Sequence, residues 1–231
     1  MGTIAVIDYG MGNLRSVFKA LEHVAPRHRV VIAQDAAAIA SADRAVFPGQ
    51  GAMPDCMAHL RQAGLLDALL EFARSRSLFG VCVGEQMLFD CSEEGEGGRG
   101  GRDDEGGHEG KDGDGGTSCL GLFPGRVVRF PAGQRDHEGR ALKVPHMGWN
   151  TVTQVRPHAL WQGIPDEERF YFVHSYYACP TDPGLDVGRS EHGVSFTSAV
   201  ARDNIFATQF HPEKSAAAGL RLYANFASWS P

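Results

Sequence analysis

A glycine-flanked cysteine at the end of an apolar run is the feature that most limits how this chain can fold. The run Leu78–Val81 is typical of a buried strand, and the Glu85–Phe89 pattern after it indicates a helix. Between them lies Gly80-Val81-Cys82-Val83-Gly84, with Cys82 at the turn. A side chain at the apex of a sharp strand-to-helix turn needs small neighbours, because the backbone is strained and the flanking segments pass closely. The pattern is typical of a nucleophile, although a buried cysteine in a glycine-rich turn looks the same locally.

A second stretch supplies a base for that nucleophile. The run Ile205–Phe210 predicts a strand that leads into His211-Pro212-Glu213. Pro212 favours extended backbone at His211, and residues two apart in an extended segment project to the same side, so we expect Glu213 beside the His211 ring. The imidazole would accept the thiol proton while the carboxylate orients the ring. Taken alone, the stretch also fits a solvated turn; together with Cys82 it favours catalysis.

These residues resemble the class I glutamine amidotransferases, which use a Cys-His-Glu triad. More narrowly, the chain resembles the glutaminase subunits of imidazole glycerol phosphate synthase. The blocks that carry the narrower resemblance are Asp8–Ser16, Pro48–Met53, Pro145–Asn150 and Tyr171–Tyr176. They follow the family's order from residue 4 to the C-terminus.

The resemblance implies an activity and a set of site residues. The chain would hydrolyse L-glutamine to glutamate and ammonia through Cys82, His211 and Glu213, with the N–H groups of Gln50 and Val83 as the oxyanion hole. The residues implied around the glutamine are Gly49, Gly51, Gln86, Ser175 and Tyr176. His174 falls in the same pocket wall, and we expect it to be structural.

The resemblance also implies a partner. The family works as a heterodimer with a (β/α)8-barrel cyclase, which uses the ammonia to form imidazole glycerol phosphate and aminoimidazole carboxamide ribotide in histidine biosynthesis. The implied interface residues are Asn13, Trp149 and Tyr171; ordinary core aromatics are the alternative for the last two. Nothing in the sequence resembles a barrel, so the partner would be another chain.

The order of apolar runs predicts an α/β fold. Strands are expected at Ile4–Ile7, Val30–Ile32 and Ala45–Phe47, with a helix after Asn13, its expected N-cap, and helical segments over Met57–Ser75 broken at Gly64. Alternating strands and helices predict a central, mostly parallel sheet flanked by helices, which is the flavodoxin-like sandwich of the class I glutamine amidotransferases. Cys82 would then lie at the carboxyl end of a central strand, where such sheets bind ligands.

The C-terminal half is predicted to consist mainly of strands. The strands predicted there are Arg126–Phe130, Leu142–Pro145, Thr151–Val155, Arg169–Ala178, Val194–Val200 and Ile205–Phe210. Arg202-Asp203-Asn204 predicts a hairpin between the last two, and hence an antiparallel flank on the sheet. Ser215 is expected to cap a closing amphipathic helix.

Residues 93–118 stand outside the family pattern. Of these 26 residues eleven are glycine and twelve are charged, and none is hydrophobic. Such a segment cannot bury enough apolar surface to offset the entropy of ordering, so we predict a disordered acidic insertion in an otherwise single domain spanning residues 1–231. The insertion carries the whole net charge of −6, so neither it nor the remainder offers a basic footprint for nucleic acid.

Composition excludes other classes of function. Five scattered cysteines without a Cys-x-x-Cys motif favour a reducing cytoplasm over a disulfide framework. Ten histidines form no ligand-spaced cluster, so we expect neither a metal nor another cofactor. No apolar stretch approaches the roughly 18 residues of a membrane span, and the N-terminus lacks the basic region of a signal peptide.

Three other functions fit parts of the sequence. A different class I glutaminase subunit, such as one serving pyridoxal phosphate synthesis, would share the triad, but Asp8–Ser16 and Pro145–Asn150 argue against it. A stand-alone cysteine hydrolase would need its own substrate pocket. A binding subunit with a decayed site is disfavoured because Cys82, His211, Glu213 and Gln86 are all present.

Overall fold

Five parallel strands form the half of the sheet that contains the N-terminus. In the computed structural model, which describes residues 2–95, 116–136 and 138–231, their order is β2 (Arg29–Ala33), β1 (Thr3–Ile7), β3 (Arg44–Gly49), β4 (Ser77–Cys82) and β13 (Ile205–Thr208). Every residue of β4 and β13 is buried. Both faces of this part of the sheet are covered, which explains why its strands read as continuous apolar runs.

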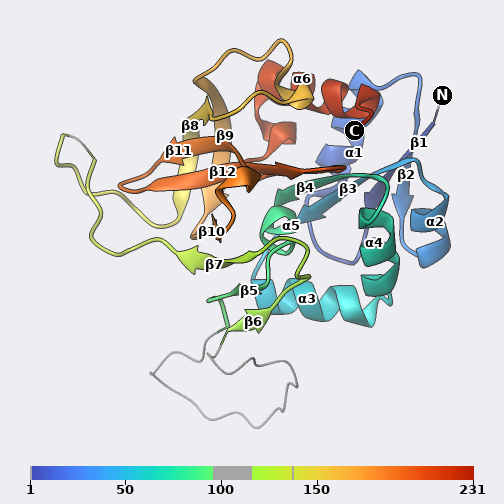
Figure 1. The fold of residues 1–231 in the computed structure, drawn as a ribbon, viewed down its shortest axis with the longest axis horizontal. Coiled ribbons are helices and arrows are strands. Elements are labelled where there is room, and N and C mark those ends of the chain that lie inside the picture. Colours follow the sequence, from blue (N-terminus) through green and yellow to red (C-terminus); the bar gives the residue numbers. More distant parts are fainter. Residues whose placement is uncertain (1, 96–115, 137) are drawn as a thin grey trace, which may run out of the picture.

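The helices cover the two faces of these strands (Figure 1). The chain passes from β1 outward to β2 and then back across β1 to β3 and β4. Because such crossovers are right-handed, this reversal puts α1 (Leu14–Val24) on one face and α2 (Ala36–Ser41), α3 (Met53–Gln62) and α4 (Leu66–Ala73) on the other. The closing helix α6 (Ala216–Ser228) packs beside α1. The short α2, which the sequence pattern did not predict, begins where Asp35 accepts the Ala38 N–H at 2.8 Å.

The other half of the sheet is largely antiparallel. It continues from β13 through β12 (Ser195–Arg202), β10 (Tyr176–Pro180) and β7 (Gly125–Arg129) to the short β5 (Cys91–Ser92) and β6 (Thr117–Ser118). Three more strands branch from β12: β11 (Asp186–Glu191), β8 (His146–Gln154) and β9 (Glu168–His174). The predicted α/β fold, with a mostly parallel centre and an antiparallel flank, is confirmed.

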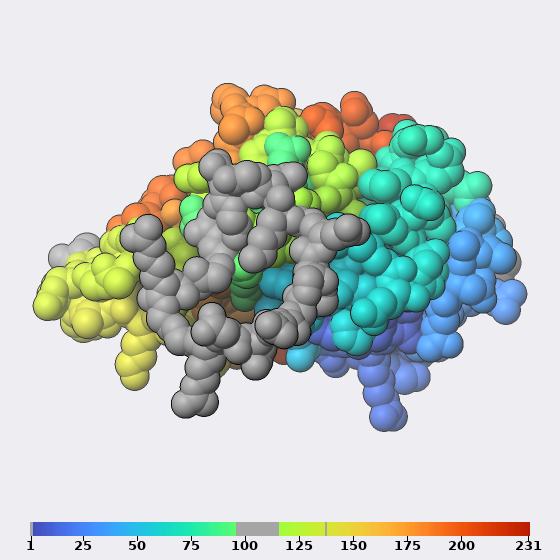
Figure 2. Space-filling view, turned by 90° about the horizontal axis from the view of Figure 1, so that it is seen from below, coloured from blue at the N-terminus to red at the C-terminus, as the bar shows by residue number. Residues whose placement is uncertain are grey.

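Two of the strand predictions were wrong. Arg169–Ala178 is two strands, β9 and β10, separated at Ser175. Leu142–Pro145 is not a strand; it belongs to the loop before β8 that projects at the end of the molecule away from the N-terminal strands (Figures 1 and 2). Pro145 has no N–H to donate to a ladder, and the strand begins only at His146.

The helix after Cys82 is a single turn, α5 (Val83–Gln86), rather than a continuous helix to Phe89. The carbonyl oxygens of Met87, Leu88 and Phe89 accept hydrogen bonds from Leu120, Leu122 and Gly121, each at 2.9 Å. The N–H groups of Leu88 and Phe89 donate three residues back, to the carbonyls of Glu85 at 3.1 Å and Gln86 at 3.3 Å, so the α-helical bonding ends after one turn.

The ends of the acidic segment take part in the fold. Thr117 and Ser118 pair with Ser92 and Cys91 across β5 and β6, and Glu93 accepts the backbone N–H of Arg129 at 3.1 Å. Residues 96–115 lie outside the described part of the chain, and for them disorder stays a prediction. Among the described residues, no helix is both long and apolar enough to cross a membrane.

Candidate active site

The pairing of β4 with β13 brings the predicted triad together. Val81 stands opposite Thr208 in these parallel strands, so the chain leaves both strands at the same edge of the sheet. Cys82 follows Val81 directly and His211 comes three residues after Thr208. Cys82 has φ 56° and ψ −115°, a strained conformation for a residue with a Cβ. The sharp turn expected from its glycine neighbours is present.

His211 and Glu213 form a buried pair. The Nδ1 atom of His211 lies 2.9 Å from Oε1 of Glu213, and the Glu213 side chain is fully shielded from solvent. The His211 N–H donates to the carbonyl oxygen of Tyr171 at 3.0 Å. Ser215 donates its hydroxyl to the His211 carbonyl at 2.6 Å and accepts the Tyr171 N–H at 3.0 Å. Ser215 therefore fixes the His211 backbone and makes no capping bond to α6, contrary to the sequence prediction.

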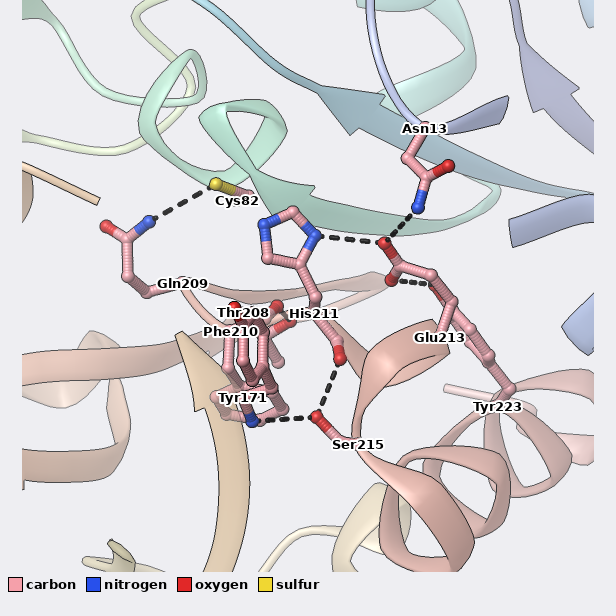
Figure 3. A network of polar contacts seen from close by, with 10 residues as sticks. All are labelled: Asn13, Cys82, Tyr171, Thr208, Gln209, Phe210, His211, Glu213, Ser215 and Tyr223. Carbon is pink, nitrogen blue, oxygen red and sulfur yellow. Dashed lines mark hydrogen bonds and ion pairs between the residues drawn. The ribbon is translucent and has the colours of Figure 1, made fainter. Parts of the chain in front are cut away.

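The other nitrogen of the His211 ring is turned toward Cys82 (Figure 3). This Nε2 atom is buried and has no hydrogen-bond partner among the described residues, so the thiol and the imidazole are neighbours without a formed hydrogen bond. Burial by itself lowers the pKa of His211, but the adjacent Cys82 and Glu213 groups outweigh it and raise the pKa from 6.5 to about 10. The site thus favours the protonated, imidazolium form of His211.

The loop after β3 faces the same edge. Gln50 and Val83, the predicted oxyanion residues, line one cavity together with Cys82. The Cys56 thiol donates to the Gln50 carbonyl at 3.3 Å, which fixes the peptide that follows Gln50. Gly49 does not line the cavity: it ends β3 opposite Cys82, and a Cβ there would lie 2.5 Å from the Gly84 nitrogen. A close approach of two backbones, rather than ligand contact, requires glycine at this position.

The cavity has a volume of about 390 Å³, in the range of small-molecule sites. Its wall includes the other predicted substrate residues, Gly51, Gln86, Ser175 and Tyr176. The Gln86 amide nitrogen donates to the Tyr176 carbonyl at 2.8 Å and to the Gln209 side chain at 2.7 Å, so its orientation is fixed.

His174 also lines the cavity, but both of its ring nitrogens are engaged. Nδ1 lies 2.8 Å from the Tyr176 carbonyl oxygen, and Nε2 lies 2.9 Å from Nδ1 of His146. A histidine bonded in this way is not free to act as a base toward Cys82, in agreement with the structural role expected for it.

Sequence reasoning missed two residues near the cysteine. Gln209 is buried and its Nε2 lies 3.7 Å from the Cys82 sulfur; it precedes His211 by two residues, so strand alternation was the signal available. Glu94 also lines the cavity, and its Oε2 accepts the Met53 N–H at the start of α3 at 2.7 Å. Glu94 went unnoticed because it lies within the segment set aside as an insertion.

The three predicted interface residues lie in different environments. Trp149 and Tyr171 face each other across β8 and β9, with ring centroids 6.2 Å apart, and Trp149 is 45% exposed. Asn13 makes no capping bond to α1. Its side-chain nitrogen instead donates to Glu213 at 3.2 Å.

The described residues include no group of three or more His, Cys, Asp or Glu side chains arranged to hold a metal ion. A thiol, an imidazole and a carboxylate in this order suit nucleophilic acyl transfer, in which a covalent intermediate forms on sulfur.

Comparisons with known proteins agree with this geometry. The family model for "Glutamine amidotransferase class-I" matches residues 5–228. The imidazole glycerol phosphate synthase subunit HisH of Aromatoleum aromaticum is 54% identical, with all of both chains covered. The HisH subunit of Dechloromonas aromatica is 55% identical over 99% of this chain and 97% of that protein.

Solved structures show the same fold at lower identity. A crystal structure of a glutamine amidotransferase has a TM-score of 0.66 at 17% identity, covering 98% of this chain and 99% of that one. The PurLQS structure from Thermotoga maritima has a TM-score of 0.67 at 15% identity, with 98% of each chain covered. With its fold, its site and its full-length relatives in agreement, this chain belongs to the class I glutamine amidotransferases and, within them, to the HisH subunits of imidazole glycerol phosphate synthase.

Proposed function

We propose that this chain hydrolyses L-glutamine and delivers the ammonia to a separate (β/α)8-barrel cyclase subunit in histidine biosynthesis. The observation that carries the proposal is the meeting of Cys82, His211 and Glu213 at one buried sheet edge beside a cavity of small-molecule size. Full-length relatives named as HisH subunits support the same assignment.

The proposed reaction has two halves. The thiol proton of Cys82 first passes to His211 Nε2, and the Cys82 sulfur then forms a bond to the carbonyl carbon of the glutamine side chain. The C–N bond then breaks and His211 returns the proton to the leaving ammonia, which leaves a thioester. Water adds to the thioester with His211 as base, the C–S bond breaks, and glutamate departs. Glu213 keeps the ring oriented through Nδ1.

The oxyanion of each tetrahedral intermediate needs donors fixed before the reaction. We assign this role to the N–H groups of Gln50 and Val83, which flank Cys82 in the cavity wall. Gly51, Gln86, Ser175 and Tyr176 would contact the amino-acid end of glutamine. Glu94 contributes a carboxylate to the same wall and suits the α-ammonium group of the substrate.

Ammonia released into water would be protonated and lost, so hydrolysis is useful only if the product is transferred directly. The proposed partner surface contains Trp149, Tyr171 and the loop ending at Asn13. The exposed Met147, 63% accessible, lies in the same strand as Trp149. Five cysteines without a disulfide agree with a cytoplasmic location.

The test is a glutaminase assay of the purified chain, alone and with a barrel cyclase and its ligand. We expect weak glutamate release alone and strong stimulation by the partner. Cys82→Ala should abolish both activities while leaving the melting temperature near that of the wild type, and Cys179→Ser serves as the matched control. Absence of glutamate release by the wild-type complex would reject the proposal; turnover of an ester or peptide instead would indicate a stand-alone hydrolase.

A further inference from the structure

The Asn13 side chain contacts the carboxylate of the proposed triad. Its Nδ2 donates to Oε1 of Glu213 at 3.2 Å, and the same oxygen accepts from His211 Nδ1 at 2.9 Å (Figure 3). A carboxylate oxygen has two lone-pair directions, so one oxygen can serve both donors. Asn13 thus donates to the lone pair of Oε1 that His211 does not use.

The remaining surroundings of Glu213 offer little else to fix its orientation. Its second oxygen, Oε2, faces the hydroxyl of Tyr223 at 3.5 Å, a distance too long for a strong hydrogen bond. Because the side chain is fully buried, water is not there to replace a lost donor. Rotation of the carboxylate about its terminal bond therefore depends mainly on His211 and Asn13.

Asn13 is placed by the loop between β1 and α1, which also touches the proposed oxyanion loop. Gly10 and Gly12 have φ values of 88° and 110°, which favour glycine. A Cβ on Gly12 would lie 3.3 Å from Pro48, and one on Gly51 would lie 2.9 Å from the Met11 side chain. The Gly10–Asn13 loop thus contacts both the residues around Gln50 and the triad carboxylate.

We infer that Asn13 is a positioning residue, which holds the Glu213 carboxylate in line with His211 Nδ1 and so sets the glutaminase rate of this chain even without a partner. The inference rests on the proposed glutaminase activity and adds a role to a residue that was expected as a helix N-cap and at the partner interface. It makes the Gly10–Asn13 loop a physical link between a docked partner and the triad.

Steady-state kinetics of the isolated chain separate this role from an interface role. Asn13→Ala should lower kcat about tenfold, equivalent to about 1.4 kcal/mol, with KM changed less than about twofold. Arg15→Ala, an exposed change two residues along the same loop–helix junction, should leave kcat of the isolated chain unchanged. Melting temperatures of both variants should stay near that of the wild type.

Asn13→Asp gives a pH signature that a loss of folding would not produce. A protonated carboxyl at position 13 can still donate to Glu213, whereas two carboxylates at hydrogen-bond distance repel each other. The other groups that face Glu213 are His211 and Tyr223, with Cys82 beyond the ring. The ratio of variant to wild-type kcat should therefore be highest at the lowest pH at which the wild type is active and fall as the pH rises, because the carboxylate of Glu213 raises the pKa of the introduced carboxyl.

A spectroscopic readout keeps the inference testable if glutamine proves not to be the substrate. The Nδ1 proton of His211 gives a far-downfield proton NMR signal, assigned by its loss in His211→Gln. That signal should shift or broaden in Asn13→Ala and stay in place in Arg15→Ala. Unchanged kcat and an unchanged signal in Asn13→Ala would overturn the inference. A changed signal in a chain without glutaminase activity would retain the positioning role and reject the proposed function.

Discussion

Gly84 lies so close to Phe47 that a Cβ on the glycine would stand 2.0 Å from the Phe47 carbonyl oxygen. Phe47 belongs to β3, two residues before Gly49, and Gly84 belongs to the turn that follows Cys82. This contact packs the turn after Cys82 against β3 and so places the turn next to the loop containing Gln50.

Gly84→Ala should therefore damage stability and activity together. No side-chain movement can relieve a clash with backbone, so β3 and α5 must separate, at a cost of about 2 kcal/mol or more. Urea unfolding and the glutaminase assay measure the two effects. Gly64→Asn is the control, because nothing lies within 4 Å of a Cβ at that position and asparagine tolerates its φ of 67°. Wild-type stability and activity in Gly84→Ala would contradict the contact.

Glu85→Gln should stabilise the protein at neutral and alkaline pH. Glu85 is fully buried, and neither carboxyl oxygen has a hydrogen-bond partner among the described residues. Burial raises its pKa well above 4.5, and the charges of Cys82 and Asp186 raise it further. Above pH 4.5 the unfolded chain loses this proton while the folded chain keeps it, so stability falls as pH rises.

The measurement for Glu85 is the free energy of unfolding against pH. The variant should match the wild type below about pH 4.5 and exceed it by at least about 1 kcal/mol at pH 8. Glu71→Gln, a change in an exposed and solvated carboxylate, should show no such divergence. Parallel curves for Glu85→Gln and the wild type would show that the buried carboxyl carries no linked proton.

His146 and His174 should make the protein sensitive to mild acid. His146 donates toward His174 and accepts from Asn150, so each ring is held in a neutral tautomer. Burial lowers the pKa of His146 from 6.5 to about 4 and that of His174 to about 3. Their contribution to stability is complete above pH 6.5 and is lost as the pH falls toward these values, since only the unfolded chain takes up the protons.

We expect about 1–2 kcal/mol of lost stability for each of the two histidines between pH 7 and pH 5. His146→Gln should reduce the slope of unfolding free energy against pH, and His23→Gln, an exposed change, should not. Equal slopes for His146→Gln and the wild type would mean that the buried pair does not titrate with folding.

Removal of residues 96–115 should leave stability and glutaminase activity nearly unchanged. Joining Gly95 to Gly116 leaves a short connection between β5 and β6, and loop entropy changes only with the logarithm of length. The free energy of unfolding should therefore differ from the wild type by less than about 1 kcal/mol. A large loss of stability or activity would give this segment a role in the fold.

A longer deletion that also removes Glu94 should impair glutamine binding. The Glu94 carboxylate accepts the Met53 N–H and lines the cavity, so removal of all of residues 93–118 should raise KM for glutamine even if the chain folds. Glu94→Gln in the full-length chain tests the charge alone. An unchanged KM in both variants would exclude Glu94 from substrate binding.

The sequence by itself determined the elements that depend on neighbouring residues. Glycines at 80 and 84 around Cys82 predicted the strained turn, and the apolar runs of β1 and β4 predicted buried parallel strands. The pairing of His211 with Glu213 was predicted, but the predicted geometry was wrong: His211 is extended, whereas Pro212–Lys214 forms one turn of 3₁₀ helix.

Only the tertiary structure decided which distant groups meet. After the single turn of α5 the chain pairs its carbonyl oxygens at residues 87–89 with the N–H groups of residues 120–122. Ser215 makes its hydrogen bonds to the backbones of His211 and Tyr171 rather than to the helix it precedes. Asn13 looked like a helix cap in sequence, yet its amide lies against Glu213, 200 positions away. The local sequence pattern reflects backbone preferences. The hydrogen-bond partner of a polar side chain depends instead on which residues the strand order brings close to it, and these can be far away in the sequence.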